Sequence, residues 1–132
     1  MHHQGQLLDH VHLRVADVAA SRRFYRAVLS AIGRLDAFGD GDGCFWADEL
    51  YVDRADTRVS CVHLAFQARS EVEVRAFHAH ALSAGGRDNG GPGLRDYGPG
   101  YYAAFVLDPD GNNIEAVWHG ALRRSAESVV VE

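Results

Sequence analysis

The sequence predicts an α+β fold made of two tandem modules, each with a strand, a helix and three further strands. Strand-like alternation followed by a helix-like apolar stripe occurs twice, near residues 7–33 and again near residues 59–86. The stripes lie 53 residues apart: Ser21, Phe24, Val28 and Ala31 in the first, and Val74, Phe77, Ala81 and Ala84 in the second. The second copy ends in a hairpin near residues 105–119. The chain is therefore an internal duplication forming one domain, with modules at about 7–56 and 59–119 and a tail at 120–132.

Composition narrows the possible functions. The formal charge of −5 and the pI near 5.9 argue against nucleic acid or an anionic membrane as the main partner. All 13 basic residues are arginine, which excludes lysine Schiff-base chemistry. No apolar run reaches the roughly 20 residues that cross a bilayer. With two cysteines and no signal-like start, we expect a cytoplasmic protein.

In the first module, residues 7–15 alternate as a strand. Val11, Leu13 and Val15 share one face, and His10, His12 and Arg14 share the other. Asp17 is a candidate N-cap for a helix that ends at Gly33. Short strands are expected at 35–38, 44–46 and 50–52, separated by a turn at 39–43 and a loop at 53–58.

The second module repeats this plan. Residues 59–66 alternate, with Val62, Leu64 and Phe66 on one face and Cys61, His63 and Ala65 on the other. Ser70 and Glu73 form a capping box at the start of a helix that stops at residues 85–86. Residues 89–100 are rich in glycine and predict a long loop.

The final hairpin contains an acidic residue inside a strand. Residues 108–111, Asp-Pro-Asp-Gly, predict the turn between two apolar runs. After the turn, one face carries Ile114, Ala116 and Trp118, and the other carries Glu115, Val117 and His119. A carboxylate in such a position is costly unless its charge is compensated, and a metal ion is one good compensator.

The duplication bears on which histidine of the first module corresponds to His63. Aligning the similar tripeptides at residues 11–13 and 62–64 pairs His63 with His12, at an offset of 51 residues. The helix offset of 53 residues pairs it with His10 instead. We adopt His10 because the offset of the helices applies without a gap.

Three segments resemble the vicinal oxygen chelate superfamily, which includes glyoxalase I, extradiol dioxygenases, fosfomycin-modifying thiol transferases and bleomycin-resistance proteins. They are residues 10–17 followed by 21–25 and Leu29, residues 63–66, and residues 108–115. The resemblance implies two βαβββ modules whose sheets curl into a cup with the helices outside. It also implies that His10, His63 and Glu115 bind a divalent metal, and that the cup closes within one chain or across a homodimer, which we expect to be the form adopted.

The alternation of the strands supports the same three ligands without the resemblance. In each strand the proposed ligand lies on one face, and the opposite face carries only apolar residues. Two imidazoles and a carboxylate suit Fe(II), Mn(II), Ni(II), Co(II) or Zn(II) and leave positions free for a small-molecule substrate. His12 is expected in the pocket wall or beside a ligand. His78 and His80 are expected on a helix surface, and His2 and His3 in the terminus.

Several reactions fit this set. Glyoxalase chemistry would favour a fourth ligand, for which Glu49 is the nearest candidate, although we prefer to interpret Glu49 as a solvated acid at a strand edge. Extradiol dioxygenation would use further acid and base groups, for which His119 and Tyr101 or Tyr102 are candidates beside Glu115. The tyrosines could instead simply pack across the sheet. Arg124 could bind a phosphonate as in fosfomycin transferases, but the lysine of that subfamily is missing.

An alternative is a protein that binds a small molecule or antibiotic without metal, as bleomycin-resistance proteins look to do. Trp46, Tyr51, Tyr101 and Tyr102, together with the net negative charge, would suit a cationic ligand. Retention of two histidines and a glutamate favours an enzyme. Cys61 could line the pocket or simply fill space.

Overall fold

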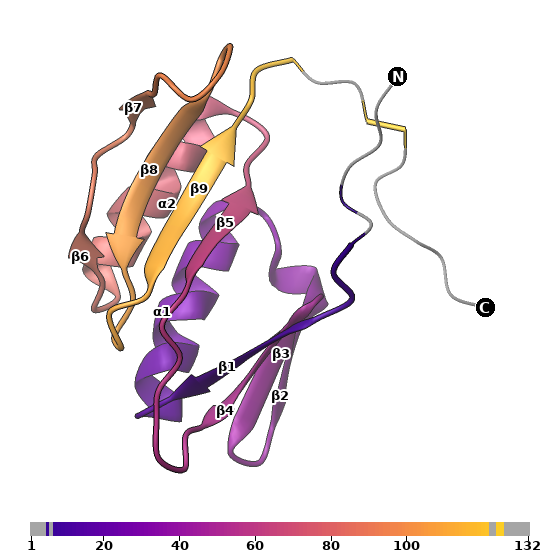
Figure 1. Ribbon diagram of the computed structural model, residues 1–132, viewed down its shortest axis with the longest axis vertical. Helices are drawn as coiled ribbons and strands as arrows, with labels where there is room; N and C mark the ends of the chain where they lie inside the picture. The colour runs from indigo at the N-terminus through magenta and orange to yellow at the C-terminus, as the bar shows by residue number, and fades with distance from the viewer. Residues whose placement is uncertain (1–4, 6, 122–123, 126–132) are drawn as a thin grey trace.

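The computed structural model describes residues 5, 7–121 and 124–125 (Figure 1). The first module contains β1 (Val11–Val15), α1 (Val18–Ala31), the 3₁₀ helix η1 (Leu35–Ala37), β2 (Phe38–Gly41), β3 (Cys44–Ala47) and β4 (Leu50–Arg54). The second contains β5 (His63–Gln67), α2 (Glu71–Ser83), β6 (Arg87–Asp88), β7 (Gly93–Leu94), β8 (Tyr102–Leu107) and β9 (Asn113–Trp118). Neither of these α-helices is long and apolar enough to cross a membrane.

The two modules share one topology, which confirms the α+β prediction and the duplication. Sheet 1 has the order β1-β4-β3-β2, and sheet 2 has the matching order β5-β9-β8-β6, with β7 also paired to β8. In both sheets the first strand runs parallel to the last strand of its module. Helices α1 and α2 begin at residues 18 and 71, so the 53-residue offset holds (71 − 18 = 53).

Both predicted helix caps are confirmed. The Asp17 carboxylate accepts a hydrogen bond from the backbone N–H of Ala20 at 3.1 Å. The Ser70 hydroxyl accepts one from the N–H of Glu73, also at 3.1 Å, and the Glu73 carboxylate accepts from the N–H of Arg69 at 2.7 Å. These bonds satisfy N–H groups that would otherwise lack a partner in the first turn.

The helices lie together on one side of the two sheets and share a core with them (Figure 1). The predicted stripes are buried, except that Ala31 is only partly covered. Tyr25 and Leu29 of α1 are buried as well, and the Tyr25 ring lies 6.1 Å from that of Phe45 on sheet 1. Helix α1 packs against α2 in addition to sheet 1. A stripe drawn for one packing partner therefore underestimates the buried surface of this helix.

Both first strands are shorter than predicted. The alternation suggested strands from residue 7 and from residue 59, but β1 begins at Val11 and β5 at His63. Each strand can extend only as far as its partner, and β4 begins at Leu50 while β9 begins at Asn113. His10 therefore lies just before its strand, whereas His63 is the first residue of its own strand.

The expected strand at 35–38 and turn at 39–43 are also wrong. Residues 35–37 form η1, and β2 continues through Gly41, leaving a two-residue turn at 42–43. The Trp46 indole lies across β2, and a Cβ added at Gly39 would come within 2.4 Å of it. The glycines that indicated a turn are thus needed for close packing of an aromatic ring. In the second module, the predicted loop at 89–100 contains β7.

Asp108 joins the hairpin to the rest of the fold. Its carboxylate is 1% exposed and accepts hydrogen bonds from the N–H groups of Asp110 and Asn112 and from the side chains of Asn112 and Tyr25. The side chain of Asn112 in turn accepts from the N–H of Val62, just before β5. The turn motif therefore fixes α1 and β5 relative to the hairpin.

Candidate functional site

Glu115 lies in the middle of β9 on the face of sheet 2 that points away from the helices, and it is 1% exposed. Its two carboxylate oxygens contact two different side chains. Nε2 of His63 lies 2.8 Å from Oε1, and the Tyr101 hydroxyl donates a short hydrogen bond to Oε2. The structure thus brings together two of the predicted metal ligands, His63 and Glu115, with one of the predicted tyrosines.

Tyr101 is held in its protonated form by this contact. Burial, followed by the hydrogen bond and charge of Glu115, raises the pKa of the phenol to about 12. The His119 ring packs edge-on against the Tyr101 ring with centroids 5.0 Å apart. Tyr101 therefore contacts Glu115 directly, and His119 contacts Tyr101.

Tyr102 is directed elsewhere. It is the first residue of β8, and its hydroxyl accepts a hydrogen bond from the guanidinium of Arg75 on α2 at 3.2 Å. Successive strand residues point to opposite faces, so Tyr101 and Tyr102 cannot both reach Glu115. Of the two candidate tyrosines, only Tyr101 joins the His63–Glu115 pair.

His10 is not part of that pair. Its Nδ1 lies 2.7 Å from the carboxylate of Asp9, and it lines a cavity of about 340 Å³ over sheet 1. Across residues 5, 7–121 and 124–125, no group of three or more His, Cys, Asp or Glu side chains is close enough to hold a metal. A three-ligand site is therefore not assembled within the described part of one chain.

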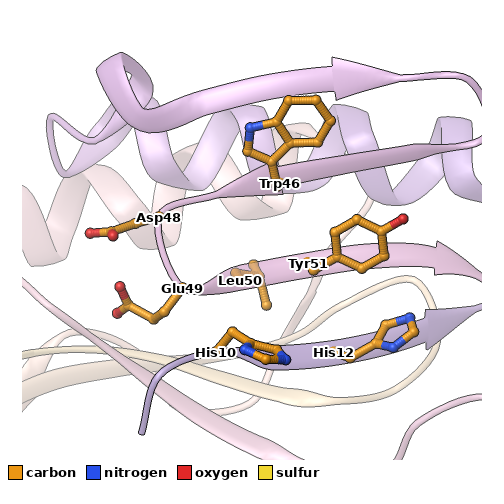
Figure 2. Close-up of a pocket in the computed structure, with 7 residues that line it drawn as sticks. All are labelled: His10, His12, Trp46, Asp48, Glu49, Leu50 and Tyr51. Carbon is orange, nitrogen blue, oxygen red and sulfur yellow. The ribbon is translucent and has the colours of Figure 1, made fainter. Parts of the chain in front are cut away.

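The cavity over sheet 1 has aromatic and acidic walls, shown in Figure 2. Its lining consists of His10, His12, Trp46, Asp48, Glu49, Leu50 and Tyr51. Burial raises the pKa of the Glu49 carboxyl, and the adjacent Asp48 carboxylate adds to the rise. Glu49 thus lies in the same cavity as His10, which is where a ligand from this module would be needed.

His12 has a partner that the sequence did not indicate. Its Nε2 lies 2.7 Å from Oδ1 of Asp53, a residue assigned from sequence to a loop but in fact part of β4. Its ring also packs edge-on against Tyr51, with centroids 5.0 Å apart. The alternation of side chains could have indicated this contact. Tyr51 and Asp53 alternate with the buried Leu50 and Val52, so they point to the same face as His12.

The two modules differ at the position of Glu115. In sheet 2, Ala65 pairs with Glu115, and in sheet 1 the residue 53 positions before Ala65, His12, pairs with Tyr51 (65 − 53 = 12). Tyr51 therefore occupies the position in sheet 1 that Glu115 occupies in sheet 2. Glu49 is two residues away from this equivalent position, so the duplication does not supply a second carboxylate of the same geometry.

The other polar candidates lie apart from Glu115. Arg124 lines a second cavity of about 270 Å³ together with Arg69, Gln67 and His119. His78 contacts Asp88 at 2.9 Å, and His80 lies 3.3 Å from a backbone carbonyl of α1. Cys61 is exposed before β5 begins. His2 and His3 lie outside the described residues.

Comparisons with known proteins agree with this architecture. An uncharacterized protein of Bacillus subtilis (strain 168), YqjT, is 30% identical over 128 residues, covering 83% of this chain and 97% of that protein. A glyoxalase/bleomycin resistance protein from Albidiferax ferrireducens T118 has 27% identity and a TM-score of 0.71, covering 86% of this chain and 98% of that one. Lactoylglutathione lyase from Agrobacterium tumefaciens has the same fold, with 17% identity and a TM-score of 0.62 over 87% and 95% of the two chains.

The family model described as the Glyoxalase/Bleomycin resistance protein/Dioxygenase superfamily matches residues 7–116. This range includes both helices and all strands except the last two residues of β9, and it contains His10, His63 and Glu115. The name of the matched superfamily includes two kinds of enzyme, glyoxalases and dioxygenases, and bleomycin resistance proteins. The chain belongs to the Glyoxalase/Bleomycin resistance protein/Dioxygenase superfamily.

Proposed function

We propose that this protein is a divalent-metal-dependent enzyme of the glyoxalase/dioxygenase type, acting on a small oxygen-bearing molecule. The observation that carries the proposal is the buried carboxylate of Glu115 with His63 and the protonated Tyr101 around it. A carboxylate placed on an open sheet face and contacted by an imidazole has the composition of a metal site. A purely structural acid would instead be expected to bind backbone N–H groups, as Asp108 does.

The donor set of the pair suits a metal. Nε2 of His63 and Oε1 of Glu115 lie 2.8 Å apart, so both would contribute to one site. A bound divalent ion would supply Lewis-acid polarisation of a ligand oxygen. Fe, Mn, Ni, Co and Zn all accept this donor set.

The third ligand in this proposal is His10 of a second copy of the chain. Within the described residues, His10 lies over sheet 1 and the pair lies on sheet 2, with no three-ligand group in one chain. A homodimer in which sheet 1 of one copy faces sheet 2 of the other would complete two equivalent sites. Such a symmetric pairing buries the same surfaces on both subunits.

The chain's own groups would then orient substrate and handle protons. Tyr101, with its pKa near 12, keeps its hydrogen at neutral pH and donates it to Oε2 of Glu115, so it would orient this carboxylate beside the substrate. His119, in contact with Tyr101, would help to fix the ring. This arrangement is compatible with lyase, isomerase or dioxygenase chemistry.

The test is titration of Ni(II) or Mn(II) into chelator-treated protein, followed by calorimetry. His10→Ala, His63→Ala and Glu115→Ala should each weaken metal binding at least about 100-fold, because each removes a ligand. His78→Ala is the matched control, since His78 also contacts a carboxylate but lies on α2. Unchanged binding in the three variants would overturn the proposal.

A mixed dimer distinguishes a shared site from one within a chain. His10→Ala and Glu115→Ala chains, co-expressed with different tags, should form pairs that regain one tight site. In such a pair, the intact His10 of one chain faces the intact His63 and Glu115 of the other. If the ligands came from one chain, both sites would stay defective.

Binding without catalysis is the second candidate function. The cavity over sheet 1 supports it, because it combines Trp46 and Tyr51 with two carboxylates. Aromatic walls and negative charge favour a cationic aromatic ligand. Absence of metal uptake by the wild-type protein, together with tight binding of such a ligand, would favour this function over the enzyme.

A further inference from the structure

Arg95 lies over the Phe105 ring, beside the His63–Glu115 pair. Its guanidinium is 5.4 Å from the centroid of that ring. Phe105 pairs with Glu115 across β8 and β9, so both side chains point to the same face of sheet 2. The centroids of the His63 and Phe105 rings are 5.9 Å apart. Phe105 is therefore a shared neighbour of the predicted metal ligands and of a cationic side chain that the proposed function does not use.

The glycine-rich segment before β8 is shaped around this guanidinium. Arg95 donates hydrogen bonds to the backbone carbonyls of Gly91 and Gly93, at 2.7 and 2.9 Å. A Cβ added at Gly90 would lie 3.3 Å from both Nη2 of Arg95 and the Phe105 ring. The segment runs along β8, to which β6 and β7 are paired (Figure 1). It thus holds one cation in a defined place next to the open face.

Within the described part of the chain, no carboxylate forms an ion pair with Arg95. Arg22 and Arg75, in contrast, are paired with Asp40 and Glu71. The carbonyls of residues 91, 93 and 94 are neutral and accept from Nη1 and Nη2, which leaves the Nε–H without an acceptor among the described residues. A guanidinium stays ionised in proteins, and its fork of donors matches the two oxygens of a carboxylate. Arg95 therefore offers both a charge and a donor to a ligand.

The charge of Arg95 acts on the Glu115 site. Burial, followed by the hydrogen bond and charge of Glu115, raises the pKa of Tyr101, and the charge of Arg95 opposes this rise. Arg95 and Phe105 are only partly buried, and the His63 side chain is 52% exposed, so a small molecule can approach all three. An anionic group beside Glu115 would be repelled by that carboxylate unless a cation compensates it. Arg95 is placed to do so.

We propose that Arg95 is a specificity-determining residue, whose guanidinium binds a carboxylate of the small molecule that occupies the site at Glu115. A single guanidinium matches the single charge of a carboxylate, and Phe105 supports its position. As a statement about the substrate of an enzyme, the inference rests on the proposed function. It narrows the substrate from an oxygen-bearing molecule to a carboxylic acid. Carboxylate binding itself needs no metal, which allows a separate test.

The test compares benzoate with benzamide in chelator-treated full-length protein. The two probes have nearly the same shape, and only benzoate is charged at neutral pH. Dissociation constants come from ¹H–¹⁵N spectra, with the Arg95 Nε–H and the Gly93 backbone N–H as reporters. Wild-type protein should bind benzoate about tenfold more tightly than benzamide, or better, as expected for hydrogen bonds to a charged group.

Arg95→Gln should remove this preference and leave benzamide binding unchanged, because glutamine keeps a donor but carries no charge. Arg75→Gln is the matched control. It removes the same charge from α2, where Arg75 is paired with Glu71 on the helix side of sheet 2, and should keep the preference. His63→Ala, which removes a predicted metal ligand, should keep it as well.

Equal binding of the two probes by wild-type protein, or a full preference in Arg95→Gln, would overturn the inference. If Arg95→Gln lost both probes through a change in the loop, the wild-type spectra would decide. Movement of the Nε–H signal by benzoate supports the inference, and a signal that benzoate leaves in place contradicts it.

Metal titration of the wild-type protein separates this inference from the proposed function. A benzoate preference in a protein that takes up no metal supports the Arg95 site and overturns the proposed enzyme. Metal uptake without any benzoate preference overturns the Arg95 site alone.

Discussion

Asp108 and Glu115 are two carboxylates of the same hairpin, each 1% exposed, with opposite environments. Asp108 accepts four hydrogen bonds, two of them from backbone N–H groups of its own turn. Glu115 accepts from two side chains, His63 and Tyr101, on an open sheet face. Burial of an acid therefore does not by itself identify a site. The nature of its partners does, because imidazole and phenol can exchange protons or bind metal and backbone amides cannot.

Asp108→Ala should have the largest effect on stability. It would leave two backbone N–H groups and the Tyr25 hydroxyl without their buried acceptor, at a cost of about 3–5 kcal/mol in the free energy of unfolding. Urea denaturation followed by circular dichroism measures this. A loss under about 1 kcal/mol would mean that Asp108 and Glu115 differ less than their contacts indicate.

Glu115→Gln should show the opposite profile. The amide can accept from Tyr101 and donate to His63, so the free energy of unfolding should change by less than about 1.5 kcal/mol. Metal affinity should nevertheless fall by at least about 100-fold, because a neutral amide is a poor ligand. Urea denaturation measures the stability of this variant, and calorimetry measures its metal affinity. Destabilisation as large as that of Asp108→Ala would assign Glu115 a mainly structural role.

Tyr25→Phe should cost about 1–3 kcal/mol, the range for a buried hydrogen bond to a charged group. Its effect should also depend on pH. Burial, followed by the Asp108 charge, raises the pKa of Tyr25 well above 10.0, so its contribution is present below pH 10 and is lost as the pH rises further. Above pH 10, wild-type stability should fall by up to about 1.4 kcal/mol per pH unit more steeply than that of Tyr25→Phe. Parallel curves would contradict this.

The adjacent tyrosines allow the smallest and most specific comparison. Tyr101→Phe removes a donor to Glu115 and should cost about 0.5–1.5 kcal/mol and alter metal affinity measurably. Tyr102→Phe removes only an exposed contact with Arg75, so stability should change by less than about 0.5 kcal/mol and metal affinity should not change. If Tyr102→Phe altered metal affinity as much as Tyr101→Phe, contact with Glu115 would not explain the effect of Tyr101.

The sequence predicts correctly those features that local chemistry decides. The caps at Asp17 and Ser70 and the turn at Asp108 each depend on residues close together in the chain. The prediction was wrong at the ends of β1 and β5 and at residues 35–43. Those boundaries depend on where the partner strand begins and on the Trp46 ring that lies over Gly39.

The two-module α+β fold and the face on which His63 and Glu115 lie could be predicted from the chain, because periodicity and duplication are properties of the sequence. The contacts of Glu115 with His63 and Tyr101, of Tyr102 with Arg75, and of His12 with Asp53 could not be predicted in this way. Only the tertiary structure places His10 over the other sheet. Such contacts join residues from different strands, and strand pairing, which no local pattern specifies, brings them within reach.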